Sequence, residues 1–421
     1  MRQRRGVGTV IAVAAVIAGL QPVARAHADV VTDWNVIALN ATAVPANSIL
    51  QSRVLAIVHG AIYDTVRAID QDGAAYAVDL KAPPGTSVDV AVAAAAHGVL
   101  LRLAPSQRPM LDAALGSAIA KMSDGPAKSG AIELGGQIAE KSVVLRSSDQ
   151  SSATGSFTHR AGVGLYQVTP PHSMAAILPQ WGGVTPFLLT SRSGLEWKGP
   201  PGVASAEFAR EFDEVKSLGA RKSASRTADQ TAAAVFWTVQ TAVPWHAAAR
   251  AAAAAKGLSV ADTARLFAIL SMATADSQIV AFAEKYKNPH WRPITAIRGA
   301  AALGIAAVKA DPDWEPLLGT PPHPEYPSAH AVFSGAAEAV LTGFFDTDAV
   351  DVTVTYPPVF GVTRTYARFS QISEEVENAR VWGGIHFRSA DQDGAAVGRR
   401  IGEMALRGFP RSAQSLALRP Q

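Results

Sequence analysis

The 421-residue chain contains no cysteine, and this absence excludes several kinds of chemistry. Disulfide bonds, thiolate metal sites, iron–sulfur clusters and cysteine nucleophiles all require that residue. Charged residues are also sparse, at 17%, whereas hydrophobic residues make up 48% of the chain. This composition supplies enough apolar material for a sizeable core, so intrinsic disorder is excluded for most of the chain.

Outside the first 28 residues, the chain also has no excess of basic over acidic side chains. Residues 1–28 contain four arginines and no acidic residue, so the remainder has 34 basic and 35 acidic side chains. The formal net charge of +3 therefore comes from the first 28 residues. A nucleic-acid partner would need a basic surface, and we expect none.

The N-terminus predicts an export signal. A basic start precedes an apolar run from Gly6 to Leu20, and two A-x-A cleavage sequences end at Ala26 and Ala28. The run is shorter than the roughly 20 residues that a spanning helix needs. We therefore expect a signal peptide over residues 1–28, a secreted or periplasmic mature protein, and no membrane attachment after cleavage. No later stretch reads as long and apolar enough to span a bilayer.

The rest of the chain predicts an all-α protein with long loops. Apolar residues recur at helical spacing in many alanine-rich stretches, with Ser259 as an expected N-cap. Residues 148–204 are rich in Gly, Pro, Ser and Thr and predict a long irregular region, and residues 350–368 allow a short β-hairpin. The expected helices cover residues 33–70 with a break at Pro45, 88–104, 107–122, 127–145, 205–218, 226–241, 245–256, 258–285, 294–309, 328–345, 370–386 and 391–408.

We expect one domain over residues 29–421. It would have an N-terminal helical half of about 29–204 and a C-terminal catalytic half of about 205–421, because the candidate catalytic and anion-binding residues all lie in the second half. They form three clusters: Lys285-Tyr-Lys-Asn-Pro-His-Trp-Arg292-Pro293, Tyr326-Pro-Ser-Ala-His330 and Arg380-Val-Trp-Gly-Gly-Ile-His386.

Together these clusters supply what a tetrahedral oxyanion needs. Two arginines and a lysine are strong, charged donors for such an anion. Ser328 and the N–H of Ala329 would lie at a helix start, where unpaired amides bind anions. The two histidines could form a bond to the central atom and move protons near neutral pH. Taken singly, each cluster also fits a solvated helix end, a capping turn or a core histidine.

The order and spacing of the clusters resemble the superfamily of type 2 phosphatidic acid phosphatases and vanadium-dependent haloperoxidases. Its pattern is K-x6-R-P, then P-S-G-H, then S-R-x5-H-x3-D. Here Ala329 replaces the glycine, Ala379 the serine and Ala390 the aspartate. Flanking stretches such as Trp291-Arg-Pro-Ile-Thr-Ala-Ile297 and His323-Pro-Glu-Tyr-Pro-Ser328 are similar to the secreted bacterial haloperoxidase branch. The resemblance implies an all-α fold built around two four-helix bundles.

The resemblance also implies a role for each matching residue. His386 would be the histidine bonded to vanadium, and His330 the acid–base residue beside the apical oxygen. Lys285 would also polarise bound peroxide and so belong to the catalytic group. The vanadate oxygens would be held by Lys285, Arg292, Ser328, Ala329 through its N–H, and Arg380.

The implied reaction is the oxidation of a halide by hydrogen peroxide to hypohalous acid, with vanadate as cofactor. A small organic halogen acceptor is a further partner. His323 stands at a position that is histidine in bromide-oxidising members of the family and phenylalanine in chloride-oxidising ones. We therefore take His323 as a halide-site candidate and expect bromide rather than chloride.

Three other hypotheses remain open on the sequence alone. The same pocket suits phosphate, which gives an exported acid phosphatase with His386 as nucleophile and His330 as acid. A non-catalytic oxyanion-binding protein and a zinc site of His323, Glu325 and His330 are the others. The missing aspartate at Ala390 leaves open what orients His386, for which a backbone carbonyl or Asp391 could serve.

Overall fold

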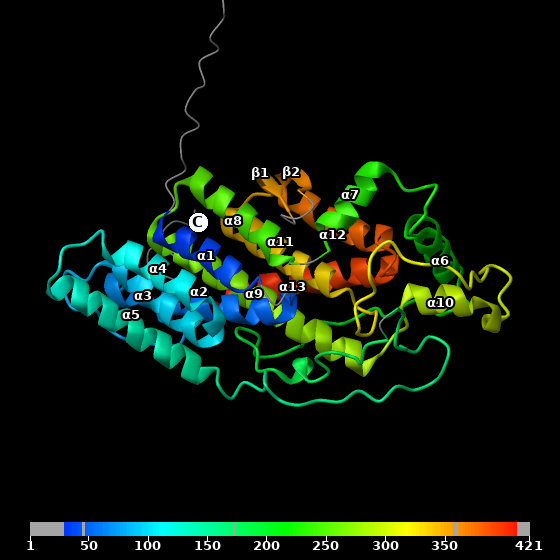
Figure 1. Ribbon diagram of the computed structural model, residues 1–421, viewed down its shortest axis with the longest axis horizontal. Helices are drawn as coiled ribbons and strands as arrows, with labels where there is room; N and C mark the ends of the chain where they lie inside the picture. The colour runs from blue at the N-terminus through cyan, green and yellow to red at the C-terminus, as the bar shows by residue number, and fades with distance from the viewer. Residues whose placement is uncertain (1–28, 44–46, 172, 239, 357–360, 411–421) are drawn as a thin grey trace, which may run out of the picture.

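The structure is a computed structural model, and it describes residues 29–43, 47–171, 173–238, 240–356 and 361–410. The expected signal peptide over residues 1–28 lies outside these residues. Within them the chain forms thirteen α-helices, three short 3-10 turns and one two-stranded sheet, which confirms the all-α fold class (Figure 1). The helices run mostly along the long axis of an elongated molecule.

The elements follow the expected order closely. The helices are α1 (Val30–Ala41), α2 (Ser48–Asp70), α3 (Val88–Leu103), α4 (Arg108–Ile119), α5 (Pro126–Leu145), α6 (Ala206–Leu218), α7 (Ala228–Phe236), α8 (Ala242–Lys256), α9 (Val260–Lys287), α10 (Pro293–Gly299), α11 (Ala329–Phe345), α12 (Phe369–Trp382) and α13 (Arg388–Gly408). The strands are β1 (Ala349–Thr355) and β2 (Thr363–Arg368), which pair antiparallel as the expected hairpin. The 3-10 turns are Pro105–Gln107, Trp181–Gly183 and Ala300–Leu303.

Besides the helix expected over 226–241, which stops at Phe236, two expected helices end earlier than their sequence pattern predicts. The helix expected over 294–309 stops at Gly299, and a 3-10 turn follows it as far as Leu303, after which Gly304 is left-handed with φ of 63°. The helix expected to reach residue 386 stops at Trp382 instead, because Gly384 takes a φ of 76°. Glycine tolerates this conformation where other residues are strained. The second ending matters for function, since it puts His386 in a connector rather than on a helix.

Helix α9 is the central element of the fold. It packs against α2 of the N-terminal half and against α11 and α13 of the C-terminal half. The Ser259 hydroxyl caps it as expected, accepting from the Asp262 N–H at 3.1 Å. Our expectation that no stretch after residue 28 could span a membrane was wrong by length and composition, because α9 meets both criteria. Its most apolar window is 94% buried inside the fold, as in the core helix of a globular protein.

Helices α11 and α13 approach each other closely through glycine. A Cβ atom added at Gly335 of α11 would overlap the backbone of Ala395, and one added at Gly398 of α13 would overlap the backbone of Val332. This contact brings the N-terminal ends of the two helices together. The Ser328 N–H donates to the Ala390 carbonyl at 3.0 Å, so the second expected cluster meets the start of the helix that follows the third.

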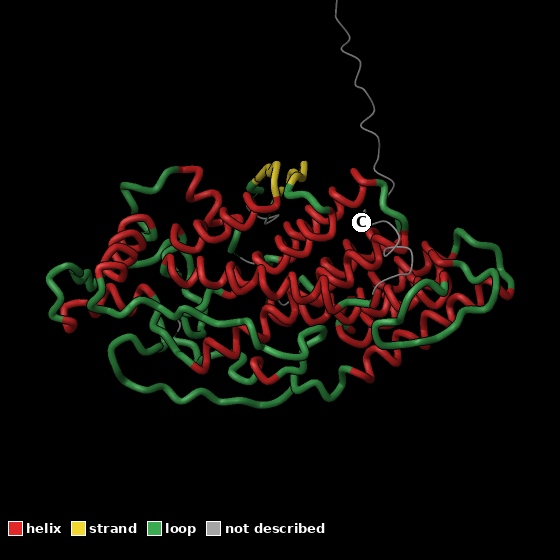
Figure 2. The backbone as a smooth tube through the Cα atoms, turned by 180° about the vertical axis from the view of Figure 1, so that it is seen from behind, coloured by secondary structure: helices red, strands yellow, loops and turns green. Residues whose placement is uncertain are grey.

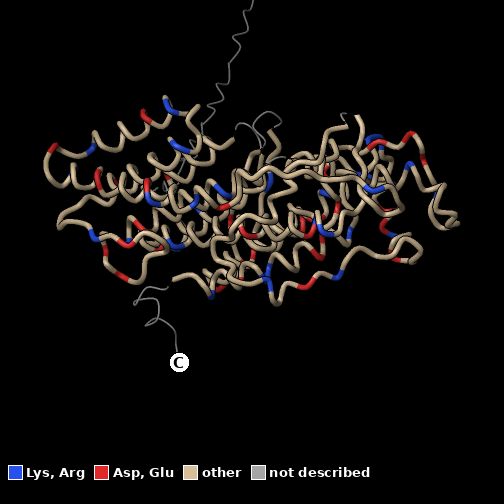
Figure 3. The backbone as a smooth tube through the Cα atoms, turned by 90° about the horizontal axis from the view of Figure 1, so that it is seen from below, with Lys and Arg blue, Asp and Glu red and all other residues tan. Residues whose placement is uncertain are grey.

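The expected irregular region, residues 148–204, runs as a long loop along one side of the molecule (Figure 2). It is tied to α9 by Asp276, whose carboxylate accepts the backbone N–H groups of Phe187, Leu188 and Leu189 at 2.6, 2.8 and 2.9 Å. Basic and acidic residues are interspersed along the described chain without a large region of one sign (Figure 3).

Candidate active site

Five of the expected site residues come from four helix ends and one connector. Lys285 lies in the last turn of α9, Arg292 is the N-cap of α10, and Arg380 lies in the last turn of α12. Ser328 is the N-cap of α11, and His386 lies in the connector between α12 and α13. All five side chains are buried, with at most 2% of the residue surface exposed. The fold therefore gathers residues from a 102-position span into one interior region.

Arg292 is the hub of this cluster. Its Nη1 donates to the Ile385 carbonyl at 2.8 Å and lies 3.2 Å from His386 Nε2. Its Nη2 lies 3.1 Å from His323 Nδ1, and its Nε donates to the His323 carbonyl at 2.9 Å. Burial lowers the pKa of Arg292 to about 10, so its guanidinium remains charged at neutral pH.

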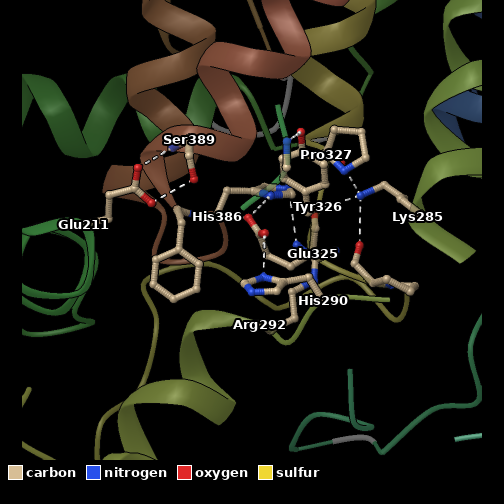
Figure 4. A network of polar contacts seen from close by, with 12 residues as sticks. Glu211, Lys285, His290, Arg292, Glu325, Tyr326, Pro327, His386 and Ser389 are labelled. Carbon is tan, nitrogen blue, oxygen red and sulfur yellow. Dashed lines mark hydrogen bonds and ion pairs between the residues drawn. The ribbon is translucent and has the colours of Figure 1, made fainter. Parts of the chain in front are cut away.

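Lys285 lies beneath the loop that leads into α11. Its Nζ donates to the carbonyls of Pro324, Glu325 and Pro327 at 2.8, 3.0 and 2.5 Å (Figure 4). Burial, followed by the charge of Arg292, lowers the pKa of Lys285 well below its usual range. A buried anion beside the two groups would restore the charged form of the lysine.

His386 is oriented by Glu325, a residue that the sequence analysis did not assign to this task. The imidazole Nδ1 lies 2.8 Å from Glu325 Oε1, which also accepts the Phe387 N–H at 3.0 Å (Figure 4). Glu325 Oε2 lies 3.4 Å from His290 Nδ1. Burial raises the pKa of Glu325, but its contacts with the two histidines outweigh burial and the net pKa is lowered.

This pairing fixes the tautomer of His386. An ionised carboxylate only accepts hydrogen bonds, so the proton sits on Nδ1 and the lone pair on Nε2, which faces Arg292. Asp391 and a backbone carbonyl, the two partners that we considered for His386, do not hold it. Asp391 is buried beside Ser328 and Arg380 instead, and burial raises its pKa well above the usual range. Glu325 was missed because 61 positions separate it from His386 in the chain.

Several buried polar atoms of the cluster have no hydrogen-bond partner among the residues that the structure describes. They include Ser328 Oγ, Arg380 Nε, His330 Nε2 and both carboxylate oxygens of Asp391. Buried polar groups in folded proteins are nearly always paired, so the unpaired donors of Ser328 and Arg380 indicate room for an anion. Burial and the charge of Arg380 lower the pKa of His330 well below its usual range, which leaves the ring neutral.

His323 also belongs to the cluster. Its side chain is buried, packs on the Phe282 ring at 5.2 Å between centroids, and faces Arg292. It does not form a set with Glu325 and His330, since Glu325 is directed at His386 and His290. A zinc site of His323, Glu325 and His330 therefore has no support in this geometry.

Ala329 packs away from the anion site. Its side chain belongs to an apolar cluster with Ile279, Val332 and Ala336, and its carbonyl accepts from the Gln278 amide at 3.0 Å. The methyl group that replaces the glycine of the motif is thus part of the core. Its N–H, at the first position of the 17-residue α11, stays available for an anion.

Comparisons with known proteins agree with this arrangement. The family model of the VCPO second helical-bundle domain matches residues 265–414, which include every candidate site residue. Vanadium chloroperoxidase of Curvularia inaequalis is 33% identical over 96 residues, covering 20% of this chain and 15% of that protein. The solved bacterial vanadium-dependent iodoperoxidase has 26% identity and a TM-score of 0.79, covering 91% of this chain and 95% of that one.

Over residues 265–414 in sequence, and over nearly the whole chain in fold, the protein is similar to the vanadium haloperoxidases. A bacterial vanadium-dependent chloroperoxidase, at 17% identity and a TM-score of 0.71, shares the fold over 86% of this chain and 93% of its own. The shared sequence with the Curvularia haloperoxidase is confined to a small part of that protein's length, whereas the shared fold extends over nearly the whole chain. The similarity to the haloperoxidases thus rests on the C-terminal half in sequence and on both halves in structure.

Proposed function

We propose that this protein is a vanadate-dependent haloperoxidase, which oxidises a halide with hydrogen peroxide to hypohalous acid. The observation that carries the proposal is the buried group of Arg292, His386 and Glu325. It presents an unprotonated imidazole nitrogen beside a charged guanidinium, which is what a metal-centred oxyanion requires. The relatives with this fold include enzymes described as an iodoperoxidase and a chloroperoxidase.

The residues present fit vanadate. Arg292, Arg380 and Lys285 would bind its oxygens, together with the orphaned Ser328 hydroxyl and the Ala329 N–H. His386 would bind the metal through Nε2. When bound, vanadate would act as a Lewis acid that polarises the O–O bond of the peroxide.

The protein's own side chains orient the metal-binding histidine, transfer a proton and stabilise negative charge. Glu325 keeps the Nδ1 proton of His386 in place, so that Nε2 stays available as a ligand. The neutral His330 accepts a proton at Nε2 from hydrogen peroxide and returns it when hypohalous acid forms. Lys285 would exchange one of its three carbonyl partners for an oxygen of the anion, where its charge would stabilise the negative charge that develops. Burial of all these groups keeps water out and strengthens each interaction.

Bromide is the halide that we propose, with iodide accepted as well because it is easier to oxidise. The proposal rests on His323, whose Nδ1 lies 3.1 Å from Arg292 Nη2, while Arg292 Nη1 lies 3.2 Å from His386 Nε2. Steady-state rates with iodide, bromide and chloride at equal concentration would test it. Chloride oxidation as fast as bromide oxidation would overturn this choice without affecting the haloperoxidase proposal.

The first experiment is bromination of a phenolic dye by the purified protein, with and without orthovanadate. We expect activity that requires hydrogen peroxide, bromide and vanadate together and that is lost in His386→Ala. Hydrolysis of a phosphate monoester by the vanadate-free protein, without dye bromination, would show an acid phosphatase instead. Tight phosphate binding with neither activity would show an oxyanion-binding protein.

We also propose export, with cleavage after Ala26 or Ala28. Cleavage after Ala28 would leave Asp29 first, and Asp29 caps α1 by accepting the Thr32 N–H at 2.8 Å. N-terminal sequencing of the protein recovered from the medium or periplasm should begin at residue 27 or 29. Recovery of an uncleaved protein in the cytoplasm would contradict export.

A further inference from the structure

A cavity of about 940 Å³ is lined in part by the segment between Lys285 and Arg292. Its walls come from the C-terminal end of α9, the connector to α10 and the long irregular region. They include the side chains of Phe157, Tyr166, Tyr286 and His290. Hydrogen peroxide and a halide ion are a few atoms in size, whereas a volume of this order holds an organic molecule.

The cavity wall is held in place by backbone pairing. The Tyr166 N–H donates to the Pro289 carbonyl at 3.1 Å, and the Trp291 N–H donates to the Gly164 carbonyl at 2.9 Å. These bonds flank an antiparallel bridge between Leu165 and His290. The irregular region is thus fixed to the segment that positions Arg292, so the cavity exists before any ligand enters.

Aromatic rings form one wall of the cavity. Phe157 packs edge-on against Tyr286 at 5.3 Å and lies 6.1 Å from Tyr166, measured between ring centroids. The Tyr166 hydroxyl is buried without a hydrogen-bond partner among the described residues. Rings in these arrangements favour a further aromatic ring, and an orphaned hydroxyl favours a polar substituent on it.

The rim adds positive charge. Arg160 and Lys287 line the cavity and are exposed, and neither makes an ion pair within the described part of the chain. The one acidic residue of the lining, Glu284, is buried, and its carboxylate accepts from the Asn288 amide at 2.5 Å. The cavity mouth therefore suits an anionic group on the bound molecule.

One side chain connects the cavity with the anion site. His290 lines the cavity, and its Nδ1 lies 3.4 Å from Glu325 Oε2, while the other oxygen of Glu325 holds His386. Tyr166, a second lining residue, is close enough to Arg292 for each charge to affect the other's pKa. An oxidant formed at the anion site would thus arise one layer of side chains away from a molecule in the cavity.

We propose that this cavity binds a small, anionic aromatic halogen acceptor of the hydroxybenzoate type. This inference rests on the proposed function, since the halogen comes from the hypohalous acid formed at the anion site. An activated ring carbon attacks the halogen of hypohalous acid, a carbon–halogen bond forms and the halogen–oxygen bond breaks. The ring then loses its proton, which combines with the departing hydroxide to give water.

The test is binding of 4-hydroxybenzoate to the full protein by calorimetry, in the wild type and in Thr158→Trp. Thr158 is an exposed residue of the lining, so the larger side chain fills the cavity without removing a core contact. We expect saturable binding in the wild type and affinity at least about tenfold lower in Thr158→Trp. The matched control is Ser152→Trp, an exposed position on the same loop outside the lining, which should bind as the wild type does.

A comparison of 4-hydroxybenzoate with neutral phenol tests the charged rim. Arg160→Gln should weaken 4-hydroxybenzoate by about threefold to tenfold and leave neutral phenol unchanged, because only the former carries a carboxylate at neutral pH. Absence of wild-type binding, equal binding in Thr158→Trp, or equal weakening of both ligands in Arg160→Gln would overturn the assignment of the cavity.

Measurements of iodide oxidation and of 4-hydroxybenzoate bromination distinguish a failure of this inference from a failure of the proposed function. Oxidation of iodide to triiodide needs no organic acceptor, so its rate should be the same in the wild type and in Thr158→Trp. The KM for bromination of 4-hydroxybenzoate should rise in Thr158→Trp only. A wild type that oxidises iodide but brominates 4-hydroxybenzoate with equal KM in both variants would contradict the acceptor site. A wild type that binds 4-hydroxybenzoate but oxidises no halide would contradict the haloperoxidase proposal.

Discussion

Glu325 and His386 are in direct hydrogen-bond contact at the candidate site, with 2.8 Å between the carboxylate Oε1 and the imidazole Nδ1. The family pattern places an aspartate four residues after this histidine, and here that position is Ala390. The carboxylate comes instead from the loop before α11, which precedes His386 in the chain. The partner of His386 that is missing four residues later in the chain is therefore supplied by a residue 61 positions earlier.

Replacing Glu325 by glutamine should weaken vanadate binding about 10-fold to 100-fold, the range observed when partners of metal-binding histidines are removed. The amide keeps the size of the side chain but lacks the charge that fixes the Nδ1 proton. Titration of the vanadate-free protein with orthovanadate by calorimetry would measure the effect.

The matched control is Glu211→Gln. Glu211 is also buried, but its carboxylate accepts from the Ser389 N–H and hydroxyl at 2.9 and 2.8 Å rather than from His386. It should bind vanadate as the wild type does. Equal vanadate affinities in Glu325→Gln and the wild type would show that His386 does not depend on this carboxylate.

The sequence was sufficient for the helices and for the identity of the cationic residues. Apolar spacing located α9 and its Ser259 cap, and the three motifs contained Lys285, Arg292 and Arg380, all of which are buried together. These features depend on local pattern, which a single sequence carries.

Partnerships across the chain could not be predicted in the same way. Glu325 stood inside a quoted motif, yet nothing local distinguishes a carboxylate that pairs with a histidine 61 positions later. The shortened end of α12 depends on the close approach of Gly384 to Gly219, again a contact between distant segments. The cavity beside His290 likewise forms between the irregular region and α9, and neither segment alone indicates it.

Asp276 should be important for stability because it anchors the irregular region to the core. Its carboxylate accepts three consecutive backbone N–H groups, and it is fully buried. Asp276→Ala would leave these amides without partners, at a cost of about 3 kcal/mol or more in the free energy of unfolding. Urea unfolding would measure it, with Asp213→Ala at an exposed position of α6 as a control that should be nearly neutral. A loss below about 1 kcal/mol in Asp276→Ala would mean that water or other groups replace the carboxylate.

A second buried network should make stability depend on pH. The Asn35 amide lies 2.9 Å from His59 Nε2 and 2.7 Å from His246 Nδ1, while Arg250 donates to its oxygen at 2.5 Å. The arginine fixes the amide as a donor to both rings, so both histidines are neutral. Burial, followed by the charge of Arg250, lowers the pKa of His59 to about 3.

Between about pH 6.5 and 3 the unfolded chain thus binds a proton at His59 that the folded chain does not. Stability from this residue is complete above pH 6.5 and is lost as the pH falls. From pH 7.5 to 5.5 the wild type should lose about 1.4 kcal/mol relative to His59→Gln, measured by urea unfolding at both values. The comparison with the variant is essential, because burial raises the pKa of Asp64 and Asp276 to about 6 and these carboxyl groups act in the opposite direction. Parallel pH profiles of the two proteins would show that His59 takes up a proton in the folded state as readily as in the unfolded state.

Ala329 offers a test of whether the departure from the P-S-G-H motif weakens the site. Its methyl group lies in an apolar cluster with Val332 and Ala336, and the N–H that an anion would use is the same in alanine and glycine. Ala329→Gly should therefore change vanadate affinity by less than about threefold and lower the free energy of unfolding by about 1 kcal/mol, through lost burial and added chain entropy. Ala336→Gly, in the same cluster but farther along α11, should lose stability similarly and leave vanadate binding unchanged. A gain of tenfold or more in vanadate affinity for Ala329→Gly alone, measured by the same calorimetric titration, would mean that the methyl group crowds the anion after all.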